Sequence, residues 1–155
     1  MQIQQIDTTT LHLVETLFDK YRVFYHQPSD IALARQFLQQ RLSNNESVIL
    51  AAVDNKNGET IPAGFIQLYP LYSSVRAQKN WILNDLYVET SYRKQGVGRK
   101  LMEAAIHFAK GEGATYIQLE TMPDNITAQR LYESIGFKQY NPFEGELVYK
   151  ISLLH

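Results

Sequence analysis

A strand, a polar loop, two glycines and an amphipathic helix follow one another between Trp81 and Ala109, and this order constrains the fold more than any other feature. The segment Trp81–Glu89 has the pattern of a buried strand. The helix-spaced apolar residues after the loop are Val97, Leu101, Ala105, Phe108 and Ala109. Gly96 and Gly98 open that helix, and residues without a Cβ let an anion approach the unpaired amides of a helix start. The stretch predicts a strand–helix unit with an anion site at the helix N-terminus.

The charge around this loop favours a phosphate ligand. Arg93, Lys94, Arg99 and Lys100 lie beside the glycines, although a turn with solvated basic side chains has the same pattern. A P-loop is excluded, because the residues after Gly98 include neither the Gly-Lys pair nor the Ser or Thr that it requires. A dinucleotide fingerprint fails twice, because Leu101 stands where its third glycine should be and Gly96 comes well downstream of the strand end at Val88. Its one matching feature is an acid, Glu120, at the end of the next predicted strand.

The rest of the chain predicts an α+β fold. Only Trp81–Thr121 forms a strand–helix–strand crossover, and the other strands suit antiparallel hairpins. Pro70 predicts where one of these strands ends, and Ser29 is the predicted N-cap of the second helix. The predicted strands are Gln2–Ile6, Ser47–Val53, Ala63–Leu71, Trp81–Glu89, Tyr116–Thr121 and Glu146–Leu153, and the helices are Leu11–Tyr25, a segment after Ser29, Val97–Ala109 and Ala128–Ile135. No repeat or linker divides the chain, so residues 1–155 are predicted to form a single domain.

Composition excludes several classes of protein. Fifteen Lys plus Arg against sixteen Asp plus Glu give a net charge of −1, which argues against a nucleic-acid partner. The absence of cysteine excludes disulfides, thiolate zinc sites and cysteine nucleophiles, and no histidine pair has metal-ligand spacing. No apolar run reaches the ~18 residues of a membrane span, and the first residues do not resemble a signal peptide. We therefore expect a cytoplasmic protein without a metal or a membrane partner.

Two ordered motifs resemble those of one known family. Arg93-x-x-Gly96-x-Gly98, after Leu86-Tyr87-Val88, resembles the acetyl-CoA motif of the GNAT superfamily of N-acetyltransferases. A later segment resembles the second motif of that family: Asn125-x-x-Ala128-x-x-Leu131-Tyr132-x-x-x-Gly136-Phe137. The resemblance implies a mixed, mostly antiparallel sheet with one crossover and flanking helices. It also implies an enzyme that moves an acetyl group directly from acetyl-CoA to a primary amine.

The same resemblance implies where the cofactor binds. The amides of Gln95 through Arg99 would bind the CoA pyrophosphate, and the backbone of Leu86–Val88 would pair with the pantetheine arm like an added strand. That arm would enter a gap where the strands Trp81–Glu89 and Tyr116–Thr121 splay apart. The implied cofactor-binding residues are Leu86, Tyr87, Val88, Arg93, Lys94, Gln95, Gly96, Val97, Gly98, Arg99, Asn125 and Tyr132.

Three residues are candidates for proton transfer. The resemblance places Tyr132 near the CoA sulfur, where its hydroxyl would protonate the leaving thiolate; the alternative is a core tyrosine packed with Ala128 and Ile135. Asp85 and Glu120 lie on the two strands that border the implied gap, and either can be the base or a structural carboxylate. A β-bulge in the first of these strands would decide which way Asp85 points.

Asn125, which the resemblance places beside the pantetheine arm, has a second interpretation as the cap of a short helix.

The acceptor is less defined than the cofactor. Small-molecule and protein amines both suit the chemistry, and the family resemblance allows a homodimer. The aromatic residues that could line an acceptor pocket, or simply belong to the core, are Tyr21, Phe24, Tyr25, Tyr69 and Tyr72. Two rival functions stay open at this stage: a non-catalytic acyl-CoA sensor of the same fold, and a nucleotide-binding module or oxidoreductase built on the glycine loop.

Overall fold

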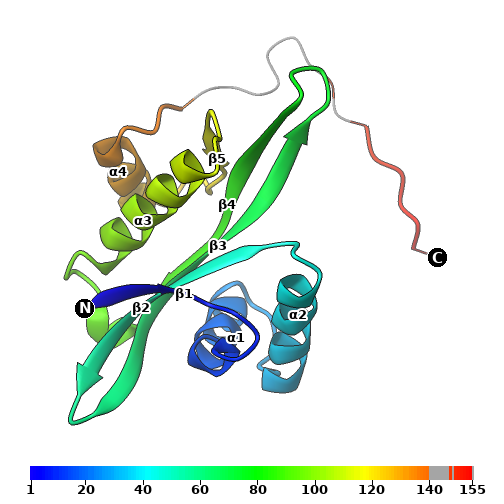
Figure 1. Ribbon diagram of the computed structural model, residues 1–155. Coiled ribbons are helices and arrows are strands. Elements are labelled where there is room, and N and C mark those ends of the chain that lie inside the picture. The colour runs from blue at the N-terminus through cyan, green and yellow to red at the C-terminus, as the bar shows by residue number, and fades with distance from the viewer. Residues whose placement is uncertain (140–146, 148, 155) are drawn as a thin grey trace. The chain divides into compact units, whose positions relative to one another are not determined.

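A five-stranded sheet forms the frame of the first of two compact units, Met1–Glu120 and Thr121–His155 (Figure 1). The computed structural model describes residues 1–139, 147 and 149–154. The strands lie in chain order, β1 (Gln2–Gln5), β2 (Val48–Lys56), β3 (Glu59–Ser73), β4 (Gln78–Val88) and β5 (Ile117–Leu119). The first four pair antiparallel, and β4 and β5 pair parallel. The predicted α+β fold with a mixed, mostly antiparallel sheet is confirmed. That residues 1–155 form a single domain stays a prediction.

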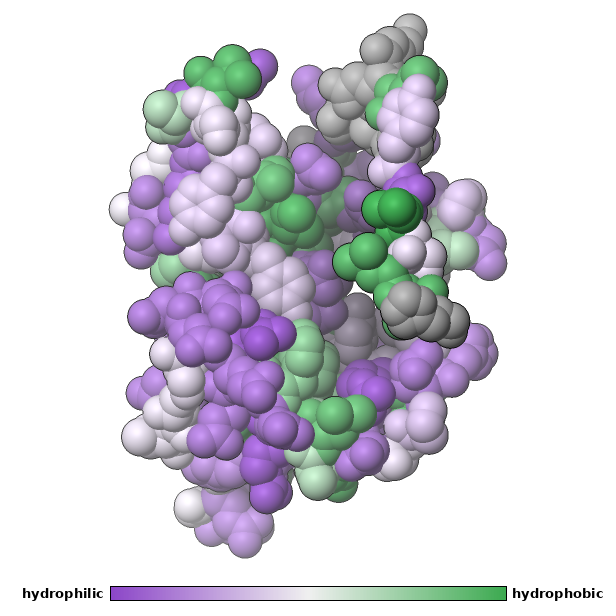
Figure 2. Space-filling model, turned by 90° about the vertical axis from the view of Figure 1, so that its right-hand side faces the viewer, coloured by the Kyte–Doolittle hydropathy of each residue, from purple (hydrophilic) through white to green (hydrophobic). Residues whose placement is uncertain are grey.

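Helices cover both faces of this sheet. α1 (Glu15–Phe24) and α2 (Ile31–Ser43) lie on one face, and α3 (Val97–Gly111) lies on the other (Figure 1). Two short 3-10 turns, η1 (Leu11–Leu13) and η2 (Thr90–Tyr92), precede α1 and α3. Over α2, hydrophilic residues surround scattered apolar ones (Figure 2). Among the helices that the structure describes, none is long and apolar enough to cross a membrane.

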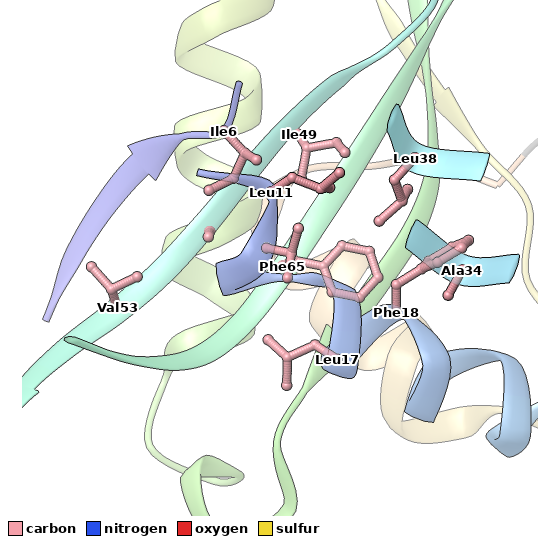
Figure 3. Packing of buried hydrophobic residues seen from close by; sticks show 11 residues of the cluster. Ile6, Leu11, Leu17, Phe18, Ala34, Leu38, Ile49, Val53 and Phe65 are labelled. Carbon is pink, nitrogen blue, oxygen red and sulfur yellow. The ribbon is translucent and has the colours of Figure 1, made fainter. Parts of the chain in front are cut away.

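The core between the sheet and α1–α2 is built around Phe18 of α1. Its ring stacks on Phe37 at 5.8 Å and meets Phe65 of β3 edge-on at 6.1 Å. Side chains alternate along β2 and β3, so every second residue enters this core. Figure 3 shows the cluster, whose buried members are Ile6, Leu11, Val14, Leu17, Phe18, Ala34, Leu38, Ile49, Ala51, Val53 and Phe65. The intervening strand residues, among them Leu50 and Ile66, are buried on the opposite face.

A β-bulge in β4 turns its side chains over halfway along the strand. Gln67 of β3 pairs with Asp85, but Leu68, the next residue, pairs with Leu83, so Asn84 is the extra residue. In a regular strand Leu83 and Asp85 would share a face. Here Leu83 lies on the α3 face, whereas Asp85 lies opposite Gln67 on the α1–α2 face. The bulge therefore directs the Asp85 carboxylate toward α1.

Two predicted boundaries were wrong. The N-cap of α2 is Asp30, whose side chain accepts from Leu33 N–H at 3.0 Å, whereas the Ser29 hydroxyl donates to Asp19 at 2.6 Å. Nor does Pro70 end its strand, because β3 continues to Ser73. Beyond Leu68, β3 pairs only with β4, so the missing N–H of Pro70 interrupts no ladder on the β2 side.

The second unit contains one helix, α4 (Ile126–Ile135), among its described residues. Gly136 ends the helix in the left-handed region at φ 118°. The predicted strand Glu146–Leu153 falls in part outside the described residues, namely at 146 and 148. Its described residues, 147 and 149–153, form no strand, so the prediction was wrong for them. Their alternating apolar pattern is exposed, with Leu147 at 81% and Ile151 at 85%, and a strand requires a paired neighbour, which these residues do not find within the described part of the chain.

Gly64 of β3 lies under the end of β4 without room for a side chain. A Cβ there would lie 2.8 Å from the carbonyl oxygen of Tyr87, and 3.3 Å from both Val88 Cα and Leu101 Cδ1. Because the nearest atom is backbone, one of the strands must shift. We expect Gly64→Ala to lower the free energy of unfolding by about 1–3 kcal/mol in urea titrations. Gly111→Ala, with nothing within 4 Å, is the matched control and should be neutral or stabilising; equal stability of the two variants would contradict the close approach.

Candidate active site

The end of β4 has one edge that β5 does not cover. Pairing between the two parallel strands is limited to Trp81, Ile82 and Leu83, which face Ile117–Leu119. After Leu83, β4 continues to Val88, and among the described residues this segment pairs only with β3, on its other side. Backbone groups on a free strand edge can pair with an extended ligand. Leu86, Tyr87 and Val88 all lie in this uncovered segment.

The glycine loop leads from this edge into the start of α3. Lys94 at φ 61° and Gly96 at φ 79° both take the left-handed conformation, which turns the chain sharply into the helix. The first amide bonded back into the helix is that of Lys100, which donates to Gly96 O at 3.1 Å. The amides of Val97, Gly98 and Arg99 precede it and point out of the helix end. The helix dipole adds partial positive charge there, so this end suits an anion.

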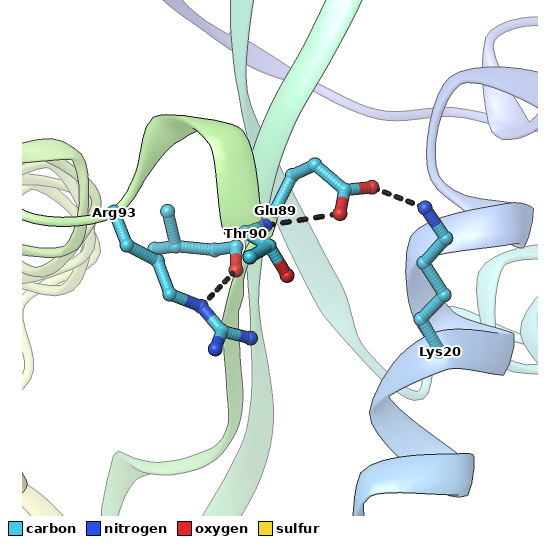
Figure 4. Close-up of polar contacts among 5 residues, drawn as sticks. Lys20, Glu89, Thr90 and Arg93 are labelled. Carbon is cyan, nitrogen blue, oxygen red and sulfur yellow. Dashed lines mark hydrogen bonds and ion pairs between the residues drawn. The ribbon is translucent and has the colours of Figure 1, made fainter.

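Two side chains brace the junction between β4 and this loop (Figure 4). The Arg93 Nε–H donates to Val88 O at 3.0 Å, and its guanidinium lies 5.5 Å from the Tyr87 ring. Glu89 accepts from Thr90 N–H at 3.0 Å and forms an ion pair with Lys20 of α1 at 2.5 Å. The Lys20 hydrogen bond lowers the pKa of Glu89, so that carboxylate is ionised at neutral pH. These contacts fix the end of β4 to both the loop and α1.

Asp85 is a nearly buried carboxylate, 4% exposed, on the α1 side of the same strand. Gln67 Nε2–H donates to its Oδ2 at 2.5 Å, and Asn84 Nδ2–H donates to its Oδ1 at 3.0 Å. Burial raises the pKa of Asp85, and the hydrogen bonds from Gln67, Tyr21 and Asn84 oppose that rise. A carboxyl whose pKa is raised binds a proton more readily than an ordinary aspartate does.

Two tyrosines lie close enough to this carboxylate for its charge to act on them. The Tyr21 hydroxyl is 3.5 Å from Asn84 O and also contacts Asp85. Burial and the nearby Asp85 charge raise the pKa of Tyr21, and they raise the pKa of Tyr69 to about 12. Both phenols are therefore neutral at physiological pH. The Tyr21 ring also meets Tyr25 at 5.0 Å, and Tyr25, which is 48% exposed, meets Phe24 at 5.2 Å. Aromatic rings thus lead from Asp85 to the surface.

The remaining predicted site residues are Glu120, Asn125 and Tyr132. Glu120 is exposed after the end of β5. Asn125 and Tyr132 belong to the second unit. Asn125 Oδ1 accepts from Ala128 N–H at 3.3 Å, which confirms the predicted cap of α4. Tyr132 is half-buried and its ring lies 6.2 Å from Phe137.

Similarity to known proteins agrees with this geometry. The sequence profile of the acetyltransferase (GNAT) family matches residues 12–137. The chain belongs to the GNAT family. An uncharacterized N-acetyltransferase of Bacillus subtilis, YhfO, is 43% identical over 143 residues, which cover 92% of this chain and 93% of that protein. A probable acetyltransferase of Haemophilus influenzae is 28% identical over 153 residues, or 99% of each chain.

A solved structure supports the same conclusion. The crystal structure of a probable acetyltransferase superposes with a TM-score of 0.87 at 39% identity, covering 98% of this chain and 99% of that one. The resemblance seen in the sequence, the fold class and the assignment as an acetyltransferase enzyme are confirmed. GNAT enzymes generally use acetyl-CoA as co-substrate and act on amines. In the part of the chain that the structure describes, no group of His, Asp and Glu could hold a metal ion.

Sequence reasoning missed two parts of the arrangement around β4. Gln67 was absent from the candidates, although a glutamine within the apolar run Ala63–Leu71 was a visible signal. The Lys20–Glu89 ion pair joins residues 69 positions apart, and neither residue belongs to a motif. Nothing in the local sequence of α1 could have indicated that pair.

Proposed function

We propose that this protein is an acetyl-CoA-dependent N-acetyltransferase that transfers an acetyl group directly to a primary amine, with Asp85 as the general base. The observation that carries the proposal is the buried Asp85 carboxylate, whose pKa is raised, on the strand whose free edge follows directly. A base for an amine must hold a proton during the reaction, and a raised pKa favours this.

The residues around the end of β4 fit CoA. The free edge at Leu86–Val88 offers backbone groups to the pantetheine amides. The α3 amides of Val97–Arg99, preceded by the amides of Gln95 and Gly96, would bind the pyrophosphate. Arg93 and Lys94 add positive charge, and the Arg93 Nε–H donates to Val88 O. Asn125 would contact the pantetheine arm in addition to capping α4.

The reaction then needs three proton transfers. A lysine-like amine has an unperturbed pKa of about 10.4, and its ammonium form has no lone pair, so it must lose a proton before attack. Asp85 accepts that proton, directly or through water. The amine nitrogen forms a bond to the acetyl carbon, the bond from that carbon to sulfur breaks, and the Tyr132 hydroxyl protonates the departing thiolate. The nitrogen loses its second proton as it becomes an amide, and that proton returns through water to the Tyr132 phenolate.

A turnover screen tests the proposed function. Acetyl-CoA is offered with a polyamine, an aminoglycoside, an amino acid and a peptide with a free N-terminus, and mass spectrometry identifies any acetylated amine. Thermal shift with acetyl-CoA, ATP and NAD runs alongside, because a ligand of the folded state raises its melting temperature. A shift with acetyl-CoA but no turnover on any amine would favour an acyl-CoA sensor. A shift with ATP or NAD instead would favour a nucleotide-binding module.

Tyr132→Phe tests the proposed general acid. The change removes one hydroxyl and keeps the ring that contacts Phe137. We expect kcat to fall about tenfold while the calorimetric affinity for acetyl-CoA stays near wild type, because the lost interaction forms in the transition state and water replaces the donor in part. Phe137→Leu, which changes the ring contact and keeps the hydroxyl, is the control for packing. Wild-type kcat in Tyr132→Phe would remove this tyrosine from the mechanism.

A further inference from the structure

Gln67 is a fully buried amide at the centre of the sheet. Its exposed fraction is 0%, and it lies on β3, which is paired with β2 at Ile49 and with β4 at Asp85. One end of the amide donates to Asp85 Oδ2. The other end, Oε1, is buried without a hydrogen-bond partner among the residues that the structure describes.

A half-satisfied amide is unfavourable in a core. A buried polar atom without a partner costs free energy, and an apolar side chain of similar size would avoid that cost. The sheet does not require a glutamine here, since neighbouring buried positions of β3 hold Phe65, Ile66 and Leu68. The hydrogen bond to Asp85 is what distinguishes this position from its neighbours. That bond points to a role in the chemistry of the carboxylate.

The register makes Gln67 a rigid donor. Its backbone is held on both sides by paired strands, and the bulge at Asn84 begins immediately beyond its partner Asp85. The bulge decides the face on which the carboxylate lies, and the amide then fixes one of its two oxygens. The second oxygen is held by Asn84 Nδ2–H from the bulge itself.

We propose that Gln67 is a positioning residue, whose side-chain amide orients the Asp85 carboxylate for proton transfer and keeps it ionised until the amine arrives. The inference rests on the proposed function, in which Asp85 is the base. An amide suits a group that changes protonation state, because it carries a donor and an acceptor on one plane. After Asp85 takes up a proton, a half-turn of the amide offers Oε1 to the new O–H.

The groups that face Asp85 do not replace this amide. They are Tyr21 from α1, Tyr69 from β3 and Asn84 from β4, and Arg41 of α2 acts on Tyr69. Both tyrosines are neutral, since their pKa values are raised. Burial raises the pKa of Asp85, and the Gln67 hydrogen bond is the largest influence against that rise. Removing the donor therefore raises this pKa further.

Gln67→Met tests the inference, since methionine keeps the length of the side chain and removes both donor and acceptor. The titration midpoint of Asp85 is followed by carbon-13 NMR of labelled aspartate carboxyls in the free protein. We expect the midpoint to rise by about one pH unit, the size of one hydrogen bond to a charged group. The pH midpoint of the acid limb in the kcat/KM profile should rise by the same amount. An unchanged midpoint in a folded variant would overturn the inference.

A matched control and a second variant complete the test. Asn80 of β4 is an equally buried amide whose Nδ2 has no partner among the described residues. Its Oδ1 accepts from Thr115 N–H and Tyr116 N–H, and it makes no hydrogen bond to Asp85 in that part of the chain. Asn80→Ser should lower the melting temperature and leave the Asp85 midpoint where it is. If Gln67→Met does not fold, Gln67→Glu takes its place, because glutamate keeps the shape of the side chain and replaces the amide donor by a second carboxyl. The titration midpoint of Asp85 should again rise. An unchanged midpoint would count against the positioning role of Gln67.

The NMR midpoint needs no turnover, which separates the two possible failures. If wild type acetylates no amine but the midpoint still rises in the variant, the proposed function fails and the coupling of Gln67 to Asp85 stands. If wild type acetylates an amine but neither the midpoint nor the acid limb moves, the proposed function stands and the positioning role fails.

Discussion

Asp85→Asn is expected to lower kcat/KM for the amine by about 10²–10³-fold, because general base catalysis contributes on that scale. The variant retains a side chain of the same shape in the site between Gln67 and Asn84, so the fold should persist by circular dichroism. In wild type, kcat/KM should fall as the pH drops through the raised pKa of Asp85, which lies above the ordinary 3.8. That acid limb should disappear in the variant, since asparagine has no proton to exchange.

Glu120→Gln provides the comparison for Asp85→Asn. Both carboxylates were candidates for the base, but Asp85 is buried among donors and Glu120 is exposed. A large loss of kcat/KM in Glu120→Gln, with near-normal turnover in Asp85→Asn, would assign the base to Glu120. Comparable small effects of both substitutions would favour a water relay without either carboxylate. In each variant the affinity for acetyl-CoA, measured by calorimetry, shows whether the change is confined to chemistry.

Gly98→Glu should weaken acetyl-CoA binding by at least about thirtyfold, or ~2 kcal/mol. The new carboxylate lies at the start of α3, where we propose that the CoA pyrophosphate binds, so it adds a like charge and occupies space. The same charge favours the helix itself, because an acid in the first turn complements the helix dipole. α3 has no acidic residue in that turn. Lost affinity with retained stability is therefore the expected result in calorimetry and thermal melting.

Gly98→Gln separates charge from size in that experiment. Glutamine fills nearly the same volume without a negative charge, so its affinity for acetyl-CoA should lie between those of wild type and the glutamate variant. The difference in acetyl-CoA affinity between the glutamine and glutamate variants should become smaller as salt is added, since salt screens the repulsion between charges, with a Debye length of about 10 Å at 0.1 M. Wild-type affinity in both variants would remove CoA from this loop.

Local patterns were sufficient to predict most of the fold. Helical spacing located α3, two apolar runs that suit a hairpin located β2 and β3, and Gly96 marked the start of α3. The possible bulge in β4 was also foreseen, but the sequence could not say where it lies. The answer depends on how β4 pairs with β3, and this pairing is fixed by packing of the whole sheet.

The contacts around Asp85 depend on residues far apart in the sequence. Tyr21, Gln67 and Asp85 come from α1, β3 and β4, and their meeting requires α1 to cover the face onto which the bulge turns the carboxylate. The N-cap of α2 was predicted at Ser29 and lies at Asp30, again because of a residue outside the local pattern. Both Ser29 and Asp30 are good N-cap residues. The Ser29 hydroxyl donates to the buried Asp19 of α1, so the Asp30 side chain caps the helix instead.

The burial of Asp85 couples proton uptake to folding. In the unfolded chain this carboxyl titrates near its ordinary pKa, whereas in the folded protein burial raises the pKa. Between those two values the folded state holds a proton that the unfolded state has released, so the free energy of unfolding falls as the pH rises through this interval. Above it, the ionised carboxylate can act as a base, and the folded state carries the full cost of that buried charge. The pH range in which Asp85 can work is therefore the range in which Asp85 contributes least to the stability of the fold.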